Sequence, residues 1–409
     1  MRTPWRALLG PSGAPLRVMV LVATGLALGA FVAIGMGSAV PRGEPPQLYV
    51  EAPERGLVGR PLDVFVSVDT PATVRVRYAE TLVEEVTQDL RVSLLAEAGT
   101  WLLEIEAEDA RGRVGRLERL VSGLWPPEPR LQVAERLTVG DALAVHLTWA
   151  HENASEPAAR VLEAFVELDG ERLPAFHGEQ RLDALAALPL RASPGERSLR
   201  AVLIDELGER HEFRASVLVE ANPNPVQELR VAASTLALVT PEGRALEAAT
   251  LARAFDAVGP EPRWAKPFLL PLEGRHTSAF GLPRRYAPGG AVSYHLGTDI
   301  AAPTGTPILA TNEGVVLVAG MYPIKGGLVV LDHGFGVTSL YFHQSSLAVA
   351  VGDVVERGQT IGYVGSTGLS TGPHLHWEMR VDGEPTAPLA WIDRRWPGGP
   401  LDTTAEVGE

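Results

Sequence analysis

The feature that most constrains this chain is a period-two alternation of apolar and polar residues in short runs. In Leu62–Val68 and in Val74–Tyr78, every second side chain is apolar. Because successive side chains of a strand point to opposite faces, this pattern predicts strands with one buried face. Turn-forming residues between the runs support the same interpretation. The chain is therefore expected to be mainly β.

An internal repeat groups these strands into two modules. Trp101–Gly112 resembles Arg197–Gly208, and in both segments an Asp followed three residues later by a Gly closes the strand. Pro126, Pro127 and Pro129 separate the two copies. Several strands per copy predict two β-sandwich modules in the immunoglobulin-like style. Neither copy contains a catalytic constellation, so we interpret them as spacers or as binding modules for envelope protein partners.

The N-terminus predicts a location outside the cytoplasm. Val18–Val40 contains no charged residue and is long enough to cross a bilayer as a helix. Arg2, Arg6 and Arg17 precede it, whereas the first acidic residue is Glu44. By the positive-inside rule, residues 18–40 form a single-pass anchor and everything after them lies outside. The alternative is a signal peptide that is cleaved, followed by secretion.

Charge and cysteine content exclude several functions. The formal net charge is −14, which argues against nucleic-acid binding because such binding needs basic patches. There is no cysteine, so disulfides, thiolate metal sites and cysteine nucleophiles are excluded. Any metal must be held by His, Asp or Glu.

Composition shifts and motif positions predict six regions. These are a cytoplasmic stub, transmembrane anchor and linker at 1–45, β-sandwich modules at 46–125 and 126–221, a linker with one short helix at 222–266, a β-patterned region in which histidines concentrate at 267–397, and a disordered tail at 398–409. The helix is expected at Glu242–Val258, which is rich in Ala, Leu and Arg.

Two histidine motifs lie in the last large region. His295 and Asp299 are four residues apart in a glycine-containing segment that we expect to be a loop entering a strand. His374, His376 and Glu378 alternate, so in a strand they share one face. Adjacent buried imidazoles are costly without a partner, and a catalytic zinc uses three N or O ligands plus a water. Each motif taken singly is also compatible with a structural histidine.

Together with their surroundings, these motifs resemble a known family, the lysostaphin/LytM-like zinc endopeptidases. The resemblance covers about the last third of the chain, in the segments Thr277–Gly281 with Arg284–Arg285, His295–Pro307, Asp332–Gly336, Tyr341–His343, Val351–Gly362 and Gly365–Glu378. The resemblance implies that residues 267–397 form an antiparallel β-sheet zinc metallopeptidase domain, in which His295, Asp299 and His376 hold one zinc ion per chain. It also implies that His343 and His374 are the catalytic pair beside it.

The implied activity is hydrolysis of peptide cross-links in bacterial peptidoglycan by metal-activated water, with the stem peptides as substrate. Residues 18–40 would then anchor the chain in the bacterial inner membrane. Gln344 and Leu328 depart from the family pattern at positions that shape loops. Arg284 either faces substrate or forms a surface ion pair, and we interpret His333 as structural.

Three other functions compete with this interpretation. A non-catalytic envelope activator of other wall hydrolases would be expected to lack part of the five-residue set, which is complete here. A metallopeptidase acting on proteins would use the same site chemistry with a different groove. A biotinyl or lipoyl carrier, which the segment Gly352–Gly362 also resembles, needs a lysine on a hairpin tip, and no lysine follows Lys325.

Overall fold

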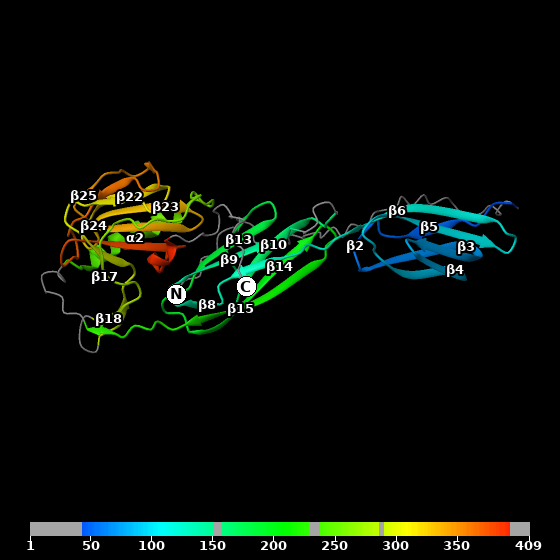
Figure 1. Ribbon diagram of the computed structural model, residues 1–409, viewed down its shortest axis with the longest axis horizontal. Helices are drawn as coiled ribbons and strands as arrows, with labels where there is room; N and C mark the ends of the chain where they lie inside the picture. Colours follow the sequence, from blue (N-terminus) through cyan, green and yellow to red (C-terminus); the bar gives the residue numbers. More distant parts are fainter. Residues whose placement is uncertain (1–42, 151–156, 229–237, 286–289, 393–409) are drawn as a thin grey trace, which may run out of the picture. The chain divides into compact units, whose positions relative to one another are not determined.

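The computed structural model describes residues 43–150, 157–228, 238–285 and 290–392 (Figure 1). The predicted anchor at residues 18–40 and the predicted tail at 398–409 lie outside these ranges. Among the described residues, no helix is both long and apolar enough to span a bilayer. These residues form mostly β-strands with one α-helix, which confirms the mainly-β class.

The strands of the first module form one hydrogen-bonded sheet in the order β1-β3-β5-β6-β2, with β4 paired to β3. Their bounds are β1 Leu48–Glu51, β2 Arg55–Leu57, β3 Pro61–Tyr78, β4 Thr81–Leu95, β5 Gly99–Asp109 and β6 Val114–Leu124. The predicted alternation is present in β3, where Val64, Val66, Val74 and Val76 are buried. The immunoglobulin-like style of the modules stays a prediction.

Two compact units divide the chain. One comprises the described residues up to Glu51 with Val64–Val92 and Leu103–Arg119. The other comprises Ala52–Asp63, Ser93–Leu102 and the described residues from Leu120 onward. The second module and the C-terminal domain therefore belong to one unit.

The second module consists of two sheets, in the orders β11-β10-β14-β15-β8 and β12-β13-β9-β7. The bounds are β7 Arg130–Val133, β8 Arg136–Thr138, β9 Ala142–Thr148, β10 Val161–Leu168, β11 Glu171–Arg172, β12 Ala175–His177, β13 Arg181–Ala187, β14 Gly195–Asp205 and β15 Arg210–Glu220. Leu143 and Val145 of one sheet share a core with Leu199 and Ala201 of the other. The two sheets thus pack face to face, as a sandwich does.

The turns of the sequence repeat have the same geometry in both copies. Asp109 Oδ1 accepts the backbone N–H groups of Arg111 and Arg113, both at about 3 Å. Asp205 Oδ1 accepts the equivalent N–H groups, two and four residues further along its own turn. Gly112 and Gly208 have φ angles of 75° and 82°, which glycine adopts without strain. The Asp and Gly of each copy are therefore required by one turn structure.

The C-terminal domain is built on an eight-stranded sheet in the order β17-β20-β28-β24-β23-β22-β26, with β29 paired to β28. The bounds are β16 Gln227–Glu228, α2 Pro241–Asp256, β17 Arg275–Ser278, β18 Pro283–Arg285, β19 Ser293–Tyr294, β20 Thr298–Ala301, β21 Pro307–Leu309, β22 Gly314–Tyr322, β23 Gly326–Gly334, β24 Val337–Gln344, β25 Ser346–Leu347, β26 Val354–Val355, β27 Thr360–Tyr363, β28 His374–Val381, β29 Glu384–Thr386 and the 3₁₀ helix η1 Pro388–Trp391. Helix α2 matches the predicted helix to within two residues at either end.

The two faces of this sheet have different partners. On one face, Leu375, Trp377 and Met379 of β28 lie in the main apolar core. On the other face, Leu251 and Ala254 of α2 pack against apolar residues of the central strands, which are Val318, Leu328, Val330, Leu340 and Phe342. The cross-strand pairs Phe342↔His376 and Leu340↔Glu378 place the histidines of β28 on this second face. Helix α2 thus covers one part of the face whose other part carries the site.

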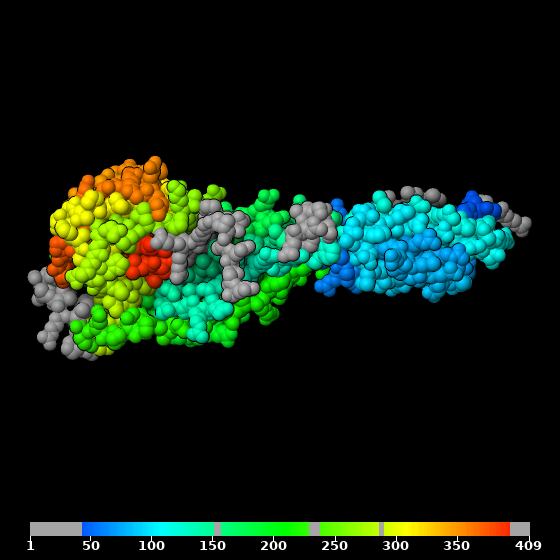
Figure 2. Space-filling view, in the orientation of Figure 1, coloured from blue at the N-terminus to red at the C-terminus, as the bar shows by residue number. Residues whose placement is uncertain are grey.

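The second module packs directly on the C-terminal domain. Its residues Ala142 and Leu185 belong to the same apolar cluster as Trp377. The ring of Phe176 lies edge-on to that of Phe335, with centroids 6.4 Å apart. Figure 2 shows the last described residues, in red, beside the cyan to green second module. The N–H of Ala387 donates to the Gly140 carbonyl at 2.8 Å. These contacts favour a supporting role for this module over that of a simple spacer.

Candidate metal centre

Two neighbouring strands and one loop bring the predicted ligands together. Asp299 on β20 lies directly opposite His376 on the antiparallel strand β28. His295 lies in the loop before β20, as the sequence predicted. Its backbone N–H donates to the Leu282 carbonyl at 3.0 Å, and its own carbonyl accepts the Gly281 N–H at 2.8 Å. The β20–β28 register therefore positions Asp299 and His376. The loop that carries His295 is held by the two backbone hydrogen bonds of that residue.

Three potential ligand atoms converge. His295 Nε2 is 3.1 Å from Asp299 Oδ1 and 3.0 Å from His376 Nδ1, and the last two atoms are 2.8 Å apart. Zinc bonds to nitrogen and oxygen of ~2.0–2.2 Å in tetrahedral geometry separate neighbouring ligand atoms by roughly 3.3 Å. One ion with small side-chain adjustments therefore reaches all three atoms. Among the described residues, His295, Asp299 and His376 form a group that could hold a metal ion, called the metal-binding group below.

In His295 and His376, the ring nitrogen that faces away from the cluster forms a hydrogen bond that orients the imidazole. His295 Nδ1 lies 2.8 Å from the Ala279 carbonyl, so this nitrogen carries the proton and Nε2 has the lone pair. His376 Nε2 lies 3.1 Å from Glu378 Oε1, so it donates to that carboxylate and leaves Nδ1 for the site. Two lone pairs and a carboxylate oxygen so close together repel one another unless a proton or a metal ion lies between them. The donor set therefore fits a divalent metal such as zinc.

His343 and His374 lie beside this cluster on the same face. Their ring centroids are 4.8 Å apart, and His374 Nε2 is 3.8 Å from Asp299 Oδ1. Each donates its Nδ1–H to a backbone carbonyl at 2.8 Å, His343 to Thr367 and His374 to Gly372. In both rings Nε2 is therefore the nitrogen left for the site. The structure brings all five predicted residues into one cluster.

Burial and charge set the protonation of the cluster. Burial by itself would lower the pKa of His376, but contacts with Asp299 and Glu378 outweigh burial and raise that pKa to about 9. Burial also raises the pKa of Asp299, yet its contacts with His295 and His376 hold it well below the usual range. In the metal-free cluster, His376 Nδ1 therefore carries a proton that a metal must displace. Burial and the neighbouring His376 lower the pKa of His343 to about 3, so this ring is neutral.

A second layer of side chains supports the ligands. Glu378 is almost fully buried, and Arg380 holds its Oε2 with two nitrogens at 2.6 and 2.7 Å. Arg284 Nη2 donates to Ser278 Oγ at 2.6 Å and lies 3.9 Å from Asp299 Oδ2. With its side chain 17% exposed, Arg284 is a partly buried neighbour of the cluster, whereas the sequence left a surface ion pair open. Arg380 was missed, although the alternation of β28 that identified Glu378 extends to it.

The remaining singled-out residues are structural. His333 is fully buried and bonds the Glu313 carbonyl and Ser339 Oγ, both at 2.7 Å, which agrees with its structural interpretation. Leu328 packs in the core beneath α2. Gln344 is buried and donates to the Tyr341 carbonyl at 3.0 Å. None of the three belongs to the metal-binding group.

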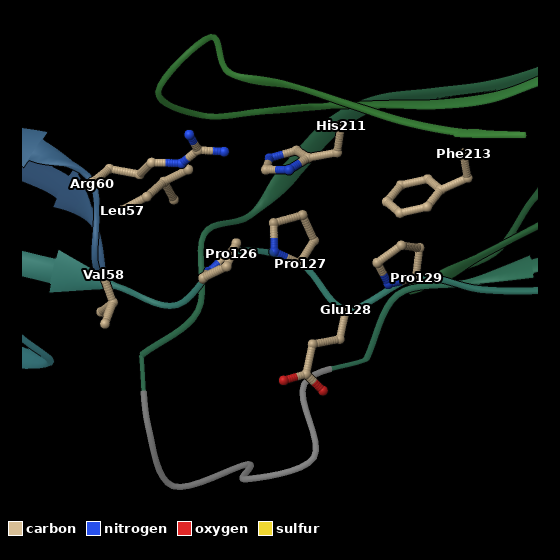
Figure 3. Close-up of a pocket in the computed structure, with 9 residues that line it drawn as sticks. All are labelled: Leu57, Val58, Arg60, Pro126, Pro127, Glu128, Pro129, His211 and Phe213. Atoms are coloured by element: carbon tan, nitrogen blue, oxygen red, sulfur yellow. The ribbon is translucent and has the colours of Figure 1, made fainter.

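A cavity of about 450 Å³ lies elsewhere in the same unit (Figure 3). It is lined by the end of β2, the proline-rich linker and β15, through Leu57, Val58, Arg60, Pro126, Pro127, Glu128, Pro129, His211 and Phe213. His211 is hydrogen-bonded to Asp205 at 2.9 Å. None of the lining residues comes from the C-terminal domain, so this cavity is separate from the metal cluster.

Fold and site together define a class: a β-sheet domain with a His₂Asp centre and two further imidazoles, which is the equipment of a metal-dependent hydrolase. The family follows from comparison with known proteins. The sequence model of Peptidase family M23 matches residues 293–388. The C-terminal part of this chain carries a peptidase M23 domain, which confirms the resemblance found in the sequence.

Several known proteins are similar over this region. The DD-carboxypeptidase/endopeptidase Mpg of Neisseria meningitidis is 47% identical over 96 residues, covering 24% of this chain and 22% of Mpg. The peptidoglycan DD-endopeptidase ShyA of Vibrio cholerae is 40% identical over 137 residues, covering 33% of this chain and 29% of ShyA. The lysostaphin catalytic domain of Staphylococcus simulans is 31% identical, covering 30% of this chain and 93% of that domain, with a TM-score of 0.27. This chain thus spans less than a third of the length of either full-length relative.

Proposed function

We propose that this protein is a zinc-dependent endopeptidase that hydrolyses peptide cross-links of bacterial peptidoglycan. The observation that carries the proposal is the convergence of His295, Asp299 and His376 with two more imidazoles turned toward them. The names of the M23 relatives, peptidoglycan DD-endopeptidases among them, supply the substrate class. Residues 18–40 are proposed to anchor the chain in the inner membrane with this domain outside the cytoplasm.

The side chains divide the chemistry between them. A zinc ion held by the three ligands would supply a Lewis acid that polarises the scissile carbonyl and activates water at neutral pH. Burial depresses the pKa of His343, so this ring is neutral and its Nε2 offers a lone pair that can hydrogen-bond the attacking water. His374 presents its Nε2 from the adjacent strand position, where it can hydrogen-bond a developing oxyanion or the leaving amine once protonated. The backbone carbonyls of Thr367 and Gly372 fix both tautomers.

Metal content and cleavage of purified muropeptides test this proposal. The expected result for the region after residue 40 is zinc near one per chain and conversion of cross-linked dimers to monomers. His376→Ala should lose both properties, since it removes one ligand. His276→Ala is the matched control, because His276 is exposed on β17 and lies outside the metal-binding group.

Each other outcome points to a different function. Stoichiometric zinc with cleavage of denatured proteins but not of muropeptides would show a protein-directed metallopeptidase. If the protein binds no zinc and cleaves nothing, the non-catalytic activator becomes the favoured function. Cleavage that persists unchanged in His376→Ala would refute the assigned metal site.

A further inference from the structure

Helix α2 buries a carboxylate that its packing does not require. Glu247 lies one and two turns before Leu251 and Ala254, on the face of α2 that meets the sheet. It is only 2% exposed. A buried carboxylate is costly unless charged or polar partners satisfy it. Its partners therefore indicate what this residue does.

All of these partners belong to the turn between β22 and β23. Glu247 Oε1 accepts the backbone N–H of Ile324 at 2.7 Å and that of Lys325 at 3.0 Å. Glu247 Oε2 accepts Lys325 Nζ at 2.9 Å. A single side chain of α2 thus holds a turn that lies almost eighty residues further along the chain. Figure 1 shows α2 beside the strands β22 and β23 that this turn connects.

The same turn holds the backbone of His343. The N–H of His343 donates to the Lys325 carbonyl at 2.9 Å. His343 has a φ of +61°, in the left-handed region that residues other than glycine rarely adopt. Such a conformation persists only where the surroundings fix it, and it concentrates at functional sites. Here a main support is the turn that Glu247 holds.

The ring of His343 is held by a loop that bonds to this turn as well. His343 Nδ1–H donates to the Thr367 carbonyl, and Thr367 Oγ1 accepts the Gly327 N–H at 2.9 Å. In the same loop, the Leu369 N–H donates to the Ile324 carbonyl at 2.7 Å. The positions of both the backbone and the ring of His343 therefore depend on one turn.

We propose that Glu247 is a positioning residue that, through the Ile324–Lys325 turn, sets the orientation of His343 beside the metal ligands. This inference rests on the proposed endopeptidase function, in which His343 hydrogen-bonds the attacking water. Helix α2 then contributes to catalysis without contacting substrate. Loss of the Glu247 contacts should lower the rate of the chemical step and leave metal binding intact, because none of the three metal ligands bonds to the turn.

A series of substitutions at Glu247 tests the proposal in the full chain. Glu247→Ala removes the acceptor, and Glu247→Asp keeps the charge but is one methylene too short to reach the turn. For both we expect kcat to fall at least fivefold, with KM within twofold and zinc content unchanged. Glu247→Gln retains an amide oxygen for the two backbone N–H groups, so it should keep kcat within about threefold of wild type.

The matched control separates positioning from helix stability. Thr240 Oγ1 accepts the Gly243 N–H at the start of α2, so Thr240→Ala weakens the same helix without touching the turn. It should lower Tm yet leave kcat within twofold. If Thr240→Ala and Glu247→Asp reduce kcat equally at a similar Tm, or if Glu247→Asp has wild-type kcat, the proposal is overturned.

Nitrogen NMR of histidine-labelled protein gives a readout that needs no substrate. In wild type, the Nδ1–H of His343 should exchange slowly with water because it is bonded to Thr367. Glu247→Asp should accelerate this exchange and leave the His376 signals in place. If the unmutated protein cleaves no muropeptide, the proposed function fails, while the exchange measurement still decides whether Glu247 positions His343. Unchanged exchange in Glu247→Asp would contradict the positioning role.

Discussion

Replacing Glu378 by glutamine should weaken metal binding while nearly preserving shape. Glu378 Oε1 accepts a hydrogen bond from His376 Nε2 at 3.1 Å, and Glu378 Oε2 forms an ion pair with Arg380. Arg380 helps to lower the pKa of Glu378 to about 2 against the opposing effect of burial, so the carboxylate is ionised at working pH. Glu378→Gln therefore removes a full negative charge next to a ligand imidazole. The remaining amide oxygen cannot accept from both His376 and Arg380 in the same way.

The size of the effect follows from this arrangement. Removing the hydrogen-bond partner of a metal-bound histidine typically costs about 10–100-fold in metal affinity. At 1.4 kcal/mol per tenfold change, this corresponds to about 1.4–2.8 kcal/mol of binding free energy. The larger value is expected here, because Glu378 is only 3% exposed and solvent does not screen its charge.

Competition with a chromophoric zinc chelator at pH 7.5 measures this change. The chelator-treated protein is titrated, and the Kd of Glu378→Gln is compared with that of wild type. Glu356→Gln is the matched control, because it makes the same chemical change at an exposed position of the same domain. A Glu378→Gln Kd within twofold of wild type would refute the role assigned to this carboxylate.

Three further predictions concern stability. Burial lowers the pKa of His333 to about 4 from 6.5, so the unfolded chain takes up its proton first as the pH falls. The stability contributed by neutral His333 is present above pH 6.5 and declines by about 3 kcal/mol toward pH 4. His333→Gln should flatten the loss of Tm over this window, and an unchanged slope would contradict the assignment. Gly297→Ala places a Cβ 2.5 Å from the Trp377 carbonyl oxygen and 2.8 Å from His376 Nε2, so it should cost about 1–3 kcal/mol and reduce zinc content. Gly372→Ala, whose Cβ meets nothing within 4 Å, should leave Tm unchanged, and equal Tm losses in both would count against the steric argument. Phe176→Ala removes a half-buried ring that packs on Phe335, so calorimetry should show the C-terminal domain losing less than the roughly 3–5 kcal/mol that a fully buried Phe contributes. An unmoved C-terminal transition would mean that the second module unfolds independently.

Local sequence determined much of the fold. Period-two alternation predicted the strands, because side-chain direction in a strand depends only on position parity. The Asp and Gly of the repeat turns were readable for a similar reason, since their hydrogen bonds stay within five residues. The shared face of His374, His376 and Glu378 followed from the same parity, and the cross-strand register agrees with it. Residues 18–40 lie outside the described chain, so the anchor stays a prediction.

Only the tertiary structure decided which contacts form between segments that are far apart in the sequence. The sequence predicted helix α2 but not that Glu247 would hold the Ile324–Lys325 turn, because an i-to-i+77 contact leaves no periodic signal. It could not show that the second module shares a core with the C-terminal domain, because an apolar residue on a sheet face looks the same whichever surface covers it. Residue types and strand parity thus identified candidate metal-binding side chains, and the family resemblance selected His295, Asp299 and His376 among them. The packing of elements far apart in the chain decided how those side chains are held in place.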